Sequence, residues 1–127
     1  MSAATEALCN HPVFRFFRVI SDIPRPSKHE EQISQFLFRW ARERGLEAEQ
    51  DEKLNILIRK PATPGYEGAP GIMLQAHMDM VCEKAPEAEH DFMKDPIHWE
   101  LDGDILSTGR RTTCVNPWPW RCWTTTP

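Results

Sequence analysis

The stretch GIMLQAHMDM, residues 71–80, decides the expected fold. Residues 71–77 form a short and almost wholly apolar run, which is typical of a strand buried on both faces of an α/β sheet. The ten residues before it, PATPGYEGAP at 61–70, are rich in proline and glycine and predict a turn-rich connection. We therefore expect an α/β fold in which the residues after this strand lie at its carboxyl end.

Two helices are predicted upstream of that strand. Residues 12–20 are mostly apolar and predict a helix buried on most sides, with Asn10 as its N-cap and Pro12 in its first turn. The next stretch, SDIPRPSK at 21–28, contains two prolines and predicts a loop.

The second helix has clear signals at both ends. Ser27 and Glu30 have the spacing of a capping box, in which each side chain accepts a hydrogen bond from the other's backbone N–H. Gly45 is placed as the glycine that follows a helix C-terminus. Between them, apolar residues at helical spacing predict one buried face. These residues are Ile33, Phe36, Leu37 and Trp40.

Short strands are predicted after the second helix. Residues 46–50 and 54–59 alternate between apolar and polar side chains. Residues 97–101 and 105–107 predict a hairpin across Asp102-Gly103, a dipeptide that favours tight turns. The order of two helices and then strands fits an α/β domain whose sheet is still being assembled.

Composition excludes several classes of protein. A length of 127 residues suits one small domain, and 40% hydrophobic with 27% charged residues is ordinary for a soluble protein. The net charge of -4 disfavours a nucleic-acid binder, because no basic excess is present to neutralise phosphates. No apolar run reaches the length of a membrane span, and the first residues do not resemble a secretory signal. We therefore expect a cytoplasmic protein whose four cysteines are free thiols.

His77 and Asp79 are the residues that could carry chemistry. They directly follow the predicted strand, and functional groups in α/β sheets gather at the carboxyl ends of strands. Side chains two residues apart in an extended chain point to the same side. Imidazole is a good zinc ligand, and a nearby carboxylate often fixes the ring. The pattern His-x-Asp is weak evidence for a metal site by itself. A histidine at a strand end that only hydrogen-bonds a neighbouring acid gives the same sequence pattern.

Four strings, one of which contains His77 and Asp79, give the His-x-Asp pattern more weight. The sequence contains IPRPSKHEEQI, NILIRKPAT, LQAHMDMVCEK and HDFMKDPI in this order. Together they resemble the N-terminal portion of the aminoacyl-histidine dipeptidases, also called Xaa-His or cytosol non-specific dipeptidases, over about residues 12–109. The resemblance implies part of a di-zinc exopeptidase catalytic domain that hydrolyses dipeptides, with a homodimer for the full-length member. It also implies that His77 binds zinc and that Asp79 is the acid that orients the metal site.

The fourth string is assigned a structural role. The residues concerned are His90, Asp91, Phe92, Lys94, Asp95, Pro96 and Ile97. Their spacing does not demand catalysis, and His11, His29 and His98 are interpreted as surface or loop histidines.

The sequence departs from the family pattern in three places. After Thr112-Thr113 it reads CVNPW, where the family has an aspartate that bridges two zinc ions. The family's later Glu-Glu pair and its distant ligands have no counterpart here. Leu54 stands where the family usually has glycine, which changes a turn. Because a zinc site needs three or four protein ligands, we expect this chain to be a truncated and inactive form.

The last stretch, RRTTCVNPWPWRCWTTTP at 110–127, has neither helical nor strand periodicity. We divide the chain into residues 1–109, the metallopeptidase part, and 110–127, an atypical tail. If Arg121 uses a CGN codon, a frame that starts one base earlier would encode a run of apolar residues and alanine over residues 118–123. A frameshift near 110–114 would then explain the tail. Two alternatives stay open: another amidohydrolase of the same superfamily, and a non-catalytic protein whose tryptophan-rich tail binds a partner.

Overall fold

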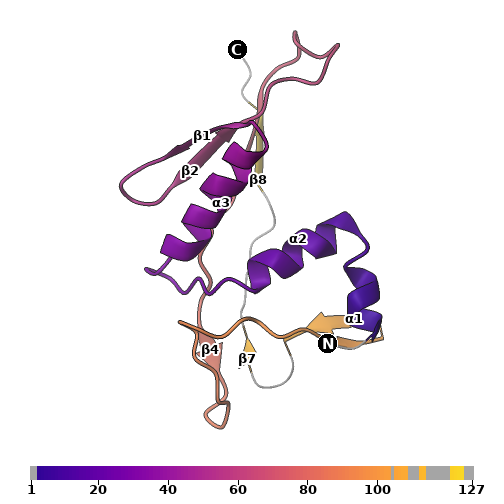
Figure 1. The fold of residues 1–127 in the computed structure, drawn as a ribbon, viewed down its shortest axis with the longest axis vertical. Coiled ribbons are helices and arrows are strands. Elements are labelled where there is room, and N and C mark those ends of the chain that lie inside the picture. Colours follow the sequence, from indigo (N-terminus) through magenta and orange to yellow (C-terminus); the bar gives the residue numbers. More distant parts are fainter. Residues whose placement is uncertain (1–2, 104, 109–111, 114–120, 125–127) are drawn as a thin grey trace. The chain divides into compact units, whose positions relative to one another are not determined.

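A computed structural model describes residues 3–103, 105–108, 112–113 and 121–124 (Figure 1). The fold combines helices and strands, so the α/β prediction is confirmed. The helices are α1 (Ala3–Leu8), α2 (Pro12–Ser21) and α3 (Glu31–Glu43). The strands are β1 (Glu47–Gln50), β2 (Ile56–Arg59), β3 (Ile72–Gln75), β4 (Glu83–Lys84), β5 (Glu100–Asp102), β6 (Ile105–Ser107), β7 (Thr112–Thr113) and β8 (Arg121–Thr124). Helix α1 and strands β4, β7 and β8 were not predicted.

The chain divides into two compact units. One consists of Met1–Ile33 with Asp79–Asn116, and the other of Ser34–Met78 with Pro117–Pro127. The strands pair two by two, as β1 with β2, β3 with β8, β4 with β7 and β5 with β6, and every pair is antiparallel. A parallel contact among the described residues is the isolated bridge between Pro26 and Met80.

Strand β3 differs from its prediction in burial. The sequence predicted a strand buried on both faces, but all four residues of β3 are exposed. Ile72 is 67% and Leu74 68% exposed. The prediction was wrong because a strand is buried by its neighbours, and β3 pairs along its backbone with a single strand, β8.

Helix α2 begins at Pro12 as predicted, but its N-cap lies one residue later than expected. His11, not Asn10, is the N-cap: its backbone is extended, and its Nδ1 accepts a hydrogen bond from the Val13 N–H at 3.3 Å. The predicted burial on most sides is also wrong, since Val13 is 64% exposed and Phe16 42%. One side of the helix packs, because the Phe17 ring lies 5.1 Å from that of buried Trp99.

Helix α3 ends as predicted. Gly45 has a φ of +69°, which glycine adopts without steric cost. Its N–H donates to the Arg42 carbonyl at 3.0 Å, and the Leu46 N–H donates to the Ala41 carbonyl at 3.1 Å. This pair of bonds is the Schellman motif, which satisfies carbonyls that the helix itself leaves unpaired.

The predicted capping box of α3 is wrong. The helix begins at Glu31, so Ser27 lies four residues before it. Glu30 Oε1 accepts a hydrogen bond from the Lys28 N–H at 2.7 Å, and the Ser27 hydroxyl donates to Asp79 Oδ2. Lys28 has a φ of +73°, so the chain turns sharply here before the helix starts.

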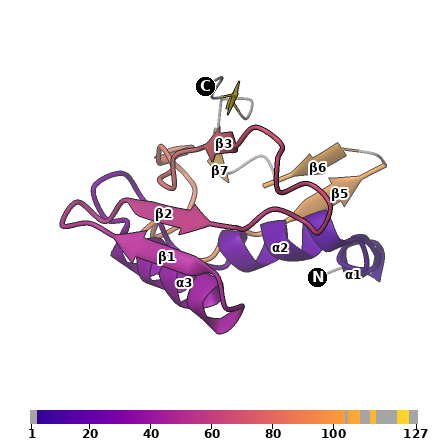
Figure 2. The same ribbon diagram turned by 90° about the horizontal axis from the view of Figure 1, so that it is seen from above.

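Strands β1 and β2 correspond to the two strands predicted after the second helix, and they pair as a hairpin beside α3 (Figure 2). Buried Ser34 of α3 donates its hydroxyl hydrogen to the Leu54 carbonyl at 2.6 Å and accepts a hydrogen bond from Gln50 Nε2 at 2.7 Å. Leu54 has a φ of +67°, in the left-handed region that favours glycine. The sequence departure at Leu54 therefore falls on a position whose backbone suits the family's glycine.

Asp51 stabilises the turn of this hairpin. It accepts hydrogen bonds at 2.8 Å from the N–H groups of Lys53 and Asn55 and from Asn55 Nδ2. The Asn55 side chain contributes most to lowering the pKa of Asp51. Because the folded pKa is lowered, this stabilisation is present above the unfolded pKa of about 4 and is lost as the pH falls through the folded value.

We expect amide hydrogen exchange to detect this pH dependence. Protection of the β2 amides should fall as the pH drops below about 4 in the parent chain. The fall should be smaller in Asp51→Asn, which has no carboxylate at this position. The ion pairs of Arg59 with Glu47 and Glu49 are present in both chains and cancel in the comparison. An identical pH profile in both chains would contradict the assignment.

The hairpin predicted across Asp102-Gly103 is present. Strands β5 and β6 pair across a turn at Gly103, whose φ is +57°, but the first strand starts at Glu100 instead of at 97. The tail contributes the backbone of β7 and β8, so the expectation of no regular structure after residue 110 is wrong at these two strands. The tail's other residues, which include Trp118 and Trp120, lie outside the described part of the chain.

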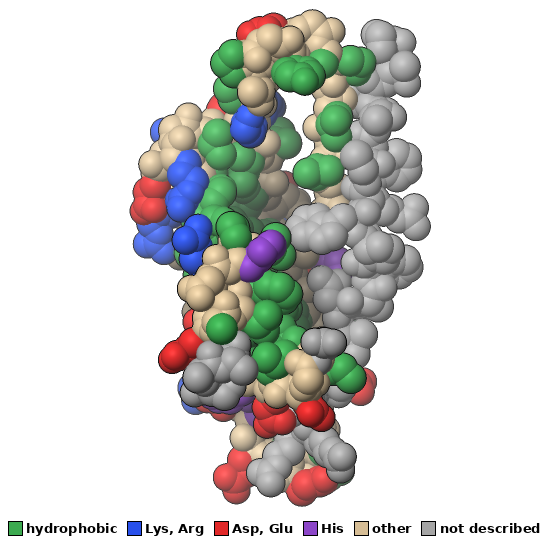
Figure 3. All heavy atoms as spheres, turned by 90° about the vertical axis from the view of Figure 1, so that its right-hand side faces the viewer, with side chains coloured by type: hydrophobic (Ala, Val, Ile, Leu, Met, Phe, Trp, Pro, Cys, Tyr) green, Lys and Arg blue, Asp and Glu red, His purple; other side chains and the backbone are tan. Residues whose placement is uncertain are grey.

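Few apolar side chains of the described residues are buried. They are Ile33, Ala41, Ala48, Met80, Ala88 and Trp99, and half of them are alanines. Figure 3 shows hydrophobic side chains open to solvent on the face that it presents. The core is therefore small for the amount of apolar sequence in the chain.

Candidate functional site

His77 lies just beyond the end of strand β3, with Ala76 between it and the last strand residue. Its side chain is exposed. His77 belongs to the unit Ser34–Met78, whereas Asp79 begins the return of the chain to the other unit. The boundary between the two units thus falls within the His-x-Asp pattern.

Asp79 is hydrogen-bonded by Ser27, which the sequence predicted as the cap of the second helix. The Ser27 hydroxyl donates to Asp79 Oδ2 at 2.5 Å, across 52 positions of sequence. Next to this bond, the Ser27 N–H donates to the Met80 carbonyl at 3.2 Å and the Met80 N–H to the Arg25 carbonyl at 2.9 Å. Ser27 lies in the string IPRPSKHEEQI and Asp79 in LQAHMDMVCEK, and both strings were part of the family resemblance. That shared resemblance was the signal in the sequence that could have connected the two residues.

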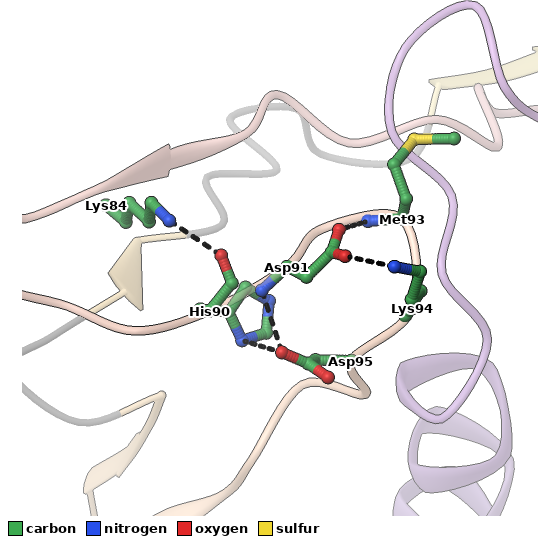
Figure 4. Close-up of polar contacts among 6 residues, drawn as sticks. All are labelled: Lys84, His90, Asp91, Met93, Lys94 and Asp95. Atoms are coloured by element: carbon green, nitrogen blue, oxygen red, sulfur yellow. Dashed lines mark hydrogen bonds and ion pairs between the residues drawn. The ribbon is translucent and has the colours of Figure 1, made fainter.

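The segment 90–95 forms a turn that is closed by its own side chains (Figure 4). Asp91 accepts hydrogen bonds from the Met93 N–H at 3.0 Å and forms an ion pair with Lys94 at 3.1 Å. Asp95 Oδ2 accepts from the Asp91 N–H at 2.7 Å and lies 4.0 Å from His90 Nδ1. Bonds of this kind are consistent with the structural role expected for these residues.

A small pocket lies between this turn and the loop before α3. Its lining is mainly apolar, and its polar or titratable members are Arg25, Cys82, His90 and Asp95. The lining residues are Ile23, Pro24, Arg25, Pro26, Met80, Cys82, His90, Phe92, Asp95 and Ile97. All of them belong to one compact unit.

Cys82 in this pocket is not suited to act as a nucleophile. Burial, and then the negative charge of Asp79, raise the pKa of the Cys82 thiol. Its Sγ donates to the Met80 carbonyl at 3.5 Å. Because the thiolate is the reactive form, a raised pKa makes the thiol inert at neutral pH. Cys9 and Cys82 are free thiols as predicted, whereas Cys114 and the side chain of Cys122 lie outside the described residues.

We expect Asp79→Asn to speed alkylation of Cys82 by iodoacetamide at pH 8 by about two- to fivefold, because removing a negative charge lowers the thiol pKa. Mass spectrometry of the peptide that contains Cys82 gives the rate, and Cys9 in the same sample serves as the internal reference. If Cys82 and Cys9 were to change in parallel, general unfolding would be the cause, and the predicted electrostatic effect would be excluded.

The described residues alone do not assemble a zinc site. Among residues 3–103, 105–108 and the two short tail strands, no group of three or more His, Cys, Asp or Glu side chains could hold a metal ion. A zinc site takes three or four protein ligands. The donor set of the described chain therefore does not fit the metal centre that the resemblance implies.

Comparisons with known proteins agree with the sequence motifs. No family model matches the chain. A cytosol non-specific dipeptidase of Escherichia coli (strain K12) is 47% identical over 106 residues, which are 84% of this chain and 22% of that protein. The crystal structure of an aminoacylhistidine dipeptidase from Vibrio alginolyticus matches with a TM-score of 0.74 and 43% identity, over 81% of this chain and 20% of that one.

These matches confirm the resemblance and the fold. The chain is similar to a part of these dipeptidases and spans about a fifth of their length. The α/β arrangement corresponds to part of a solved dipeptidase structure. In the part of the chain that the structure describes, no helix is both long and apolar enough to cross a membrane.

Proposed function

We propose that this chain is part of a cytoplasmic hydrolase of dipeptides, of the aminoacylhistidine dipeptidase type. The observation that carries the proposal is a similarity in both sequence and structure over about four fifths of the chain. The word cytosol in the bacterial relative's name supports the location. The net charge of -4 supports a small-molecule substrate in place of a nucleic acid.

Within that enzyme, His77 is proposed as a zinc ligand and Asp79 as the acid that orients the metal site. A metal pair in such a site would activate water and polarise the scissile carbonyl. The chain's described residues lack the further ligands that two zinc ions require, so the chain by itself is proposed to be inactive. Activity would then depend on residues of the kind that occupy the other four fifths of the relatives.

A chimera tests the proposal. The 106 matched residues of this chain replace the corresponding segment of the Escherichia coli dipeptidase. We expect the chimera to hydrolyse a dipeptide that ends in histidine, and the isolated chain with added zinc to show no turnover above the uncatalysed rate. The unmodified dipeptidase, prepared in the same way, is the control.

Each alternative outcome has a clear meaning. A folded chimera that hydrolyses N-acetyl amino acids but not dipeptides would support the related amidohydrolase instead. A folded chimera without any hydrolytic activity would contradict the proposal that this segment supplies functional site residues. Turnover by the isolated chain would contradict its proposed inactivity.

A further inference from the structure

The turn that precedes α3 places a hydroxyl group on the candidate site. Pro26 to His29 form a turn in which the His29 N–H donates to the Pro26 carbonyl at 2.9 Å. Lys28 sits in the left-handed region, with a φ of +73°. Such a conformation costs a non-glycine residue roughly 1–2 kcal/mol, and strain of this kind persists only where surrounding contacts fix it.

Met80 makes those surrounding contacts. Met80 is buried, at 8% exposure, and its backbone bonds to the residues on either side of Pro26, namely Arg25 and Ser27. The parallel bridge between Pro26 and Met80 fixes the spacing of the two segments. Residues 25–27 and 79–80 therefore form one rigid strip within a single compact unit.

On this strip the Ser27 hydroxyl meets Asp79. The oxygen–oxygen distance of 2.5 Å is within the range of charge-assisted bonds between a hydroxyl and a carboxylate. A second and longer contact of 3.4 Å joins the same hydroxyl to the Met80 carbonyl. The hydroxyl thus links the Asp79 carboxylate to the turn before α3.

We propose that Ser27 is a positioning residue that holds the Asp79 carboxylate in one orientation. The inference rests on the proposed function in one respect, namely that Asp79 is the acid that orients the metal site. Its consequence is that the orientation of this acid is built into the N-terminal turn before any metal or substrate binds. Ser27 itself need not contact substrate or metal.

The test is a measurement of the Asp79 χ1 rotamer by NMR in the isotopically labelled full chain. Three-bond couplings to the two Asp79 β-protons distinguish one rotamer, with one large and one small value, from averaging. The measurement is made at about 15 °C, where small domains are close to their greatest stability. We expect a single rotamer in the parent chain and averaged couplings in Ser27→Ala.

Two further variants make the result specific. Ser27→Thr keeps the hydroxyl and should restore the single rotamer. Ser107→Ala removes another exposed serine hydroxyl of the same unit, one that donates to the Glu100 carbonyl at 3.5 Å, and should leave Asp79 unchanged.

Three results would overturn the proposal: averaged couplings in the parent chain, a single rotamer retained in Ser27→Ala, or averaging in Ser107→Ala as well. The readout contains neither metal nor substrate. If the chimera is inactive while the rotamer responds as expected, the proposed function fails and the positioning role stands.

Discussion

Replacing His77 with alanine in the active chimera is expected to lower kcat/KM for a dipeptide on the order of 10³-fold. His77 lies just beyond strand β3. It belongs to the motif LQAHMDM, which resembles the dipeptidases. Removing a ligand from a site that needs three or four leaves a metal bound weakly and in the wrong geometry. The loss should therefore be far larger than that of a surface substitution.

The measurement is kcat/KM with added zinc, together with the metal content of the purified protein by elemental analysis. The matched control is His98→Ala, which removes another exposed histidine of the chain and should leave both values within about twofold of the chimera. If His77→Ala retained full activity and full metal content, His77 would not be a ligand.

Much of the local structure could be predicted from the sequence because its signals are short-range. Gly45 is the clearest example, since a glycine at the end of an apolar helix pattern fixes a left-handed residue whatever the remainder of the chain does. The hairpin turn at Asp102-Gly103 is of the same kind. His77 at the end of β3 was found because a short apolar run and a shared motif coincide there.

The errors have a different physical origin, because they concern contacts between distant segments. Ser27 and Glu30 have the sequence spacing of a capping box, but the Ser27 hydroxyl donates to the carboxylate of Asp79, 52 residues away. The cap would use the Ser27 hydroxyl oxygen as an acceptor for the Glu30 N–H, whereas the folded chain uses the hydroxyl as a donor to Asp79, so contacts between distant segments decide the outcome. Burial of β3 was mispredicted for a related reason, since an apolar strand shows a preference for burial without supplying the neighbours that bury it.

The isolated chain is expected to unfold over a broad temperature range, with a free energy of unfolding below about 3 kcal/mol at 25 °C. Most small domains reach 5–15 kcal/mol, chiefly by burying apolar side chains. Here half of the buried apolar residues are alanines, while the face of β3 and much of α2 stay exposed. Exposed apolar surface of that kind stabilises nothing and is expected to bind the dye ANS.

Circular dichroism melting and ANS fluorescence measure this, and two substitutions separate the causes. Trp99→Ala removes the largest buried side chain of the core, which Phe17 contacts at 5.1 Å, and would cost about 3–5 kcal/mol in a well-packed protein. In this chain such a loss exceeds the whole expected stability, so the melting transition should disappear. Leu74→Ser changes a side chain that is 68% exposed. It should lower ANS binding without lowering the temperature of the melting transition.

A sharp transition in the parent chain, with a free energy typical of a complete domain, would contradict this expectation. It would mean that the small core suffices and that the chain stands as an independent folding unit. A broad transition in the chain combined with a sharp one in the chimera would instead place the missing stabilisation in the contacts that the relatives' additional residues make. In that case the exposed side chains of α2 and β3 are the surfaces on which those contacts form, and Leu74→Ser should destabilise the chimera while leaving the isolated chain unaffected.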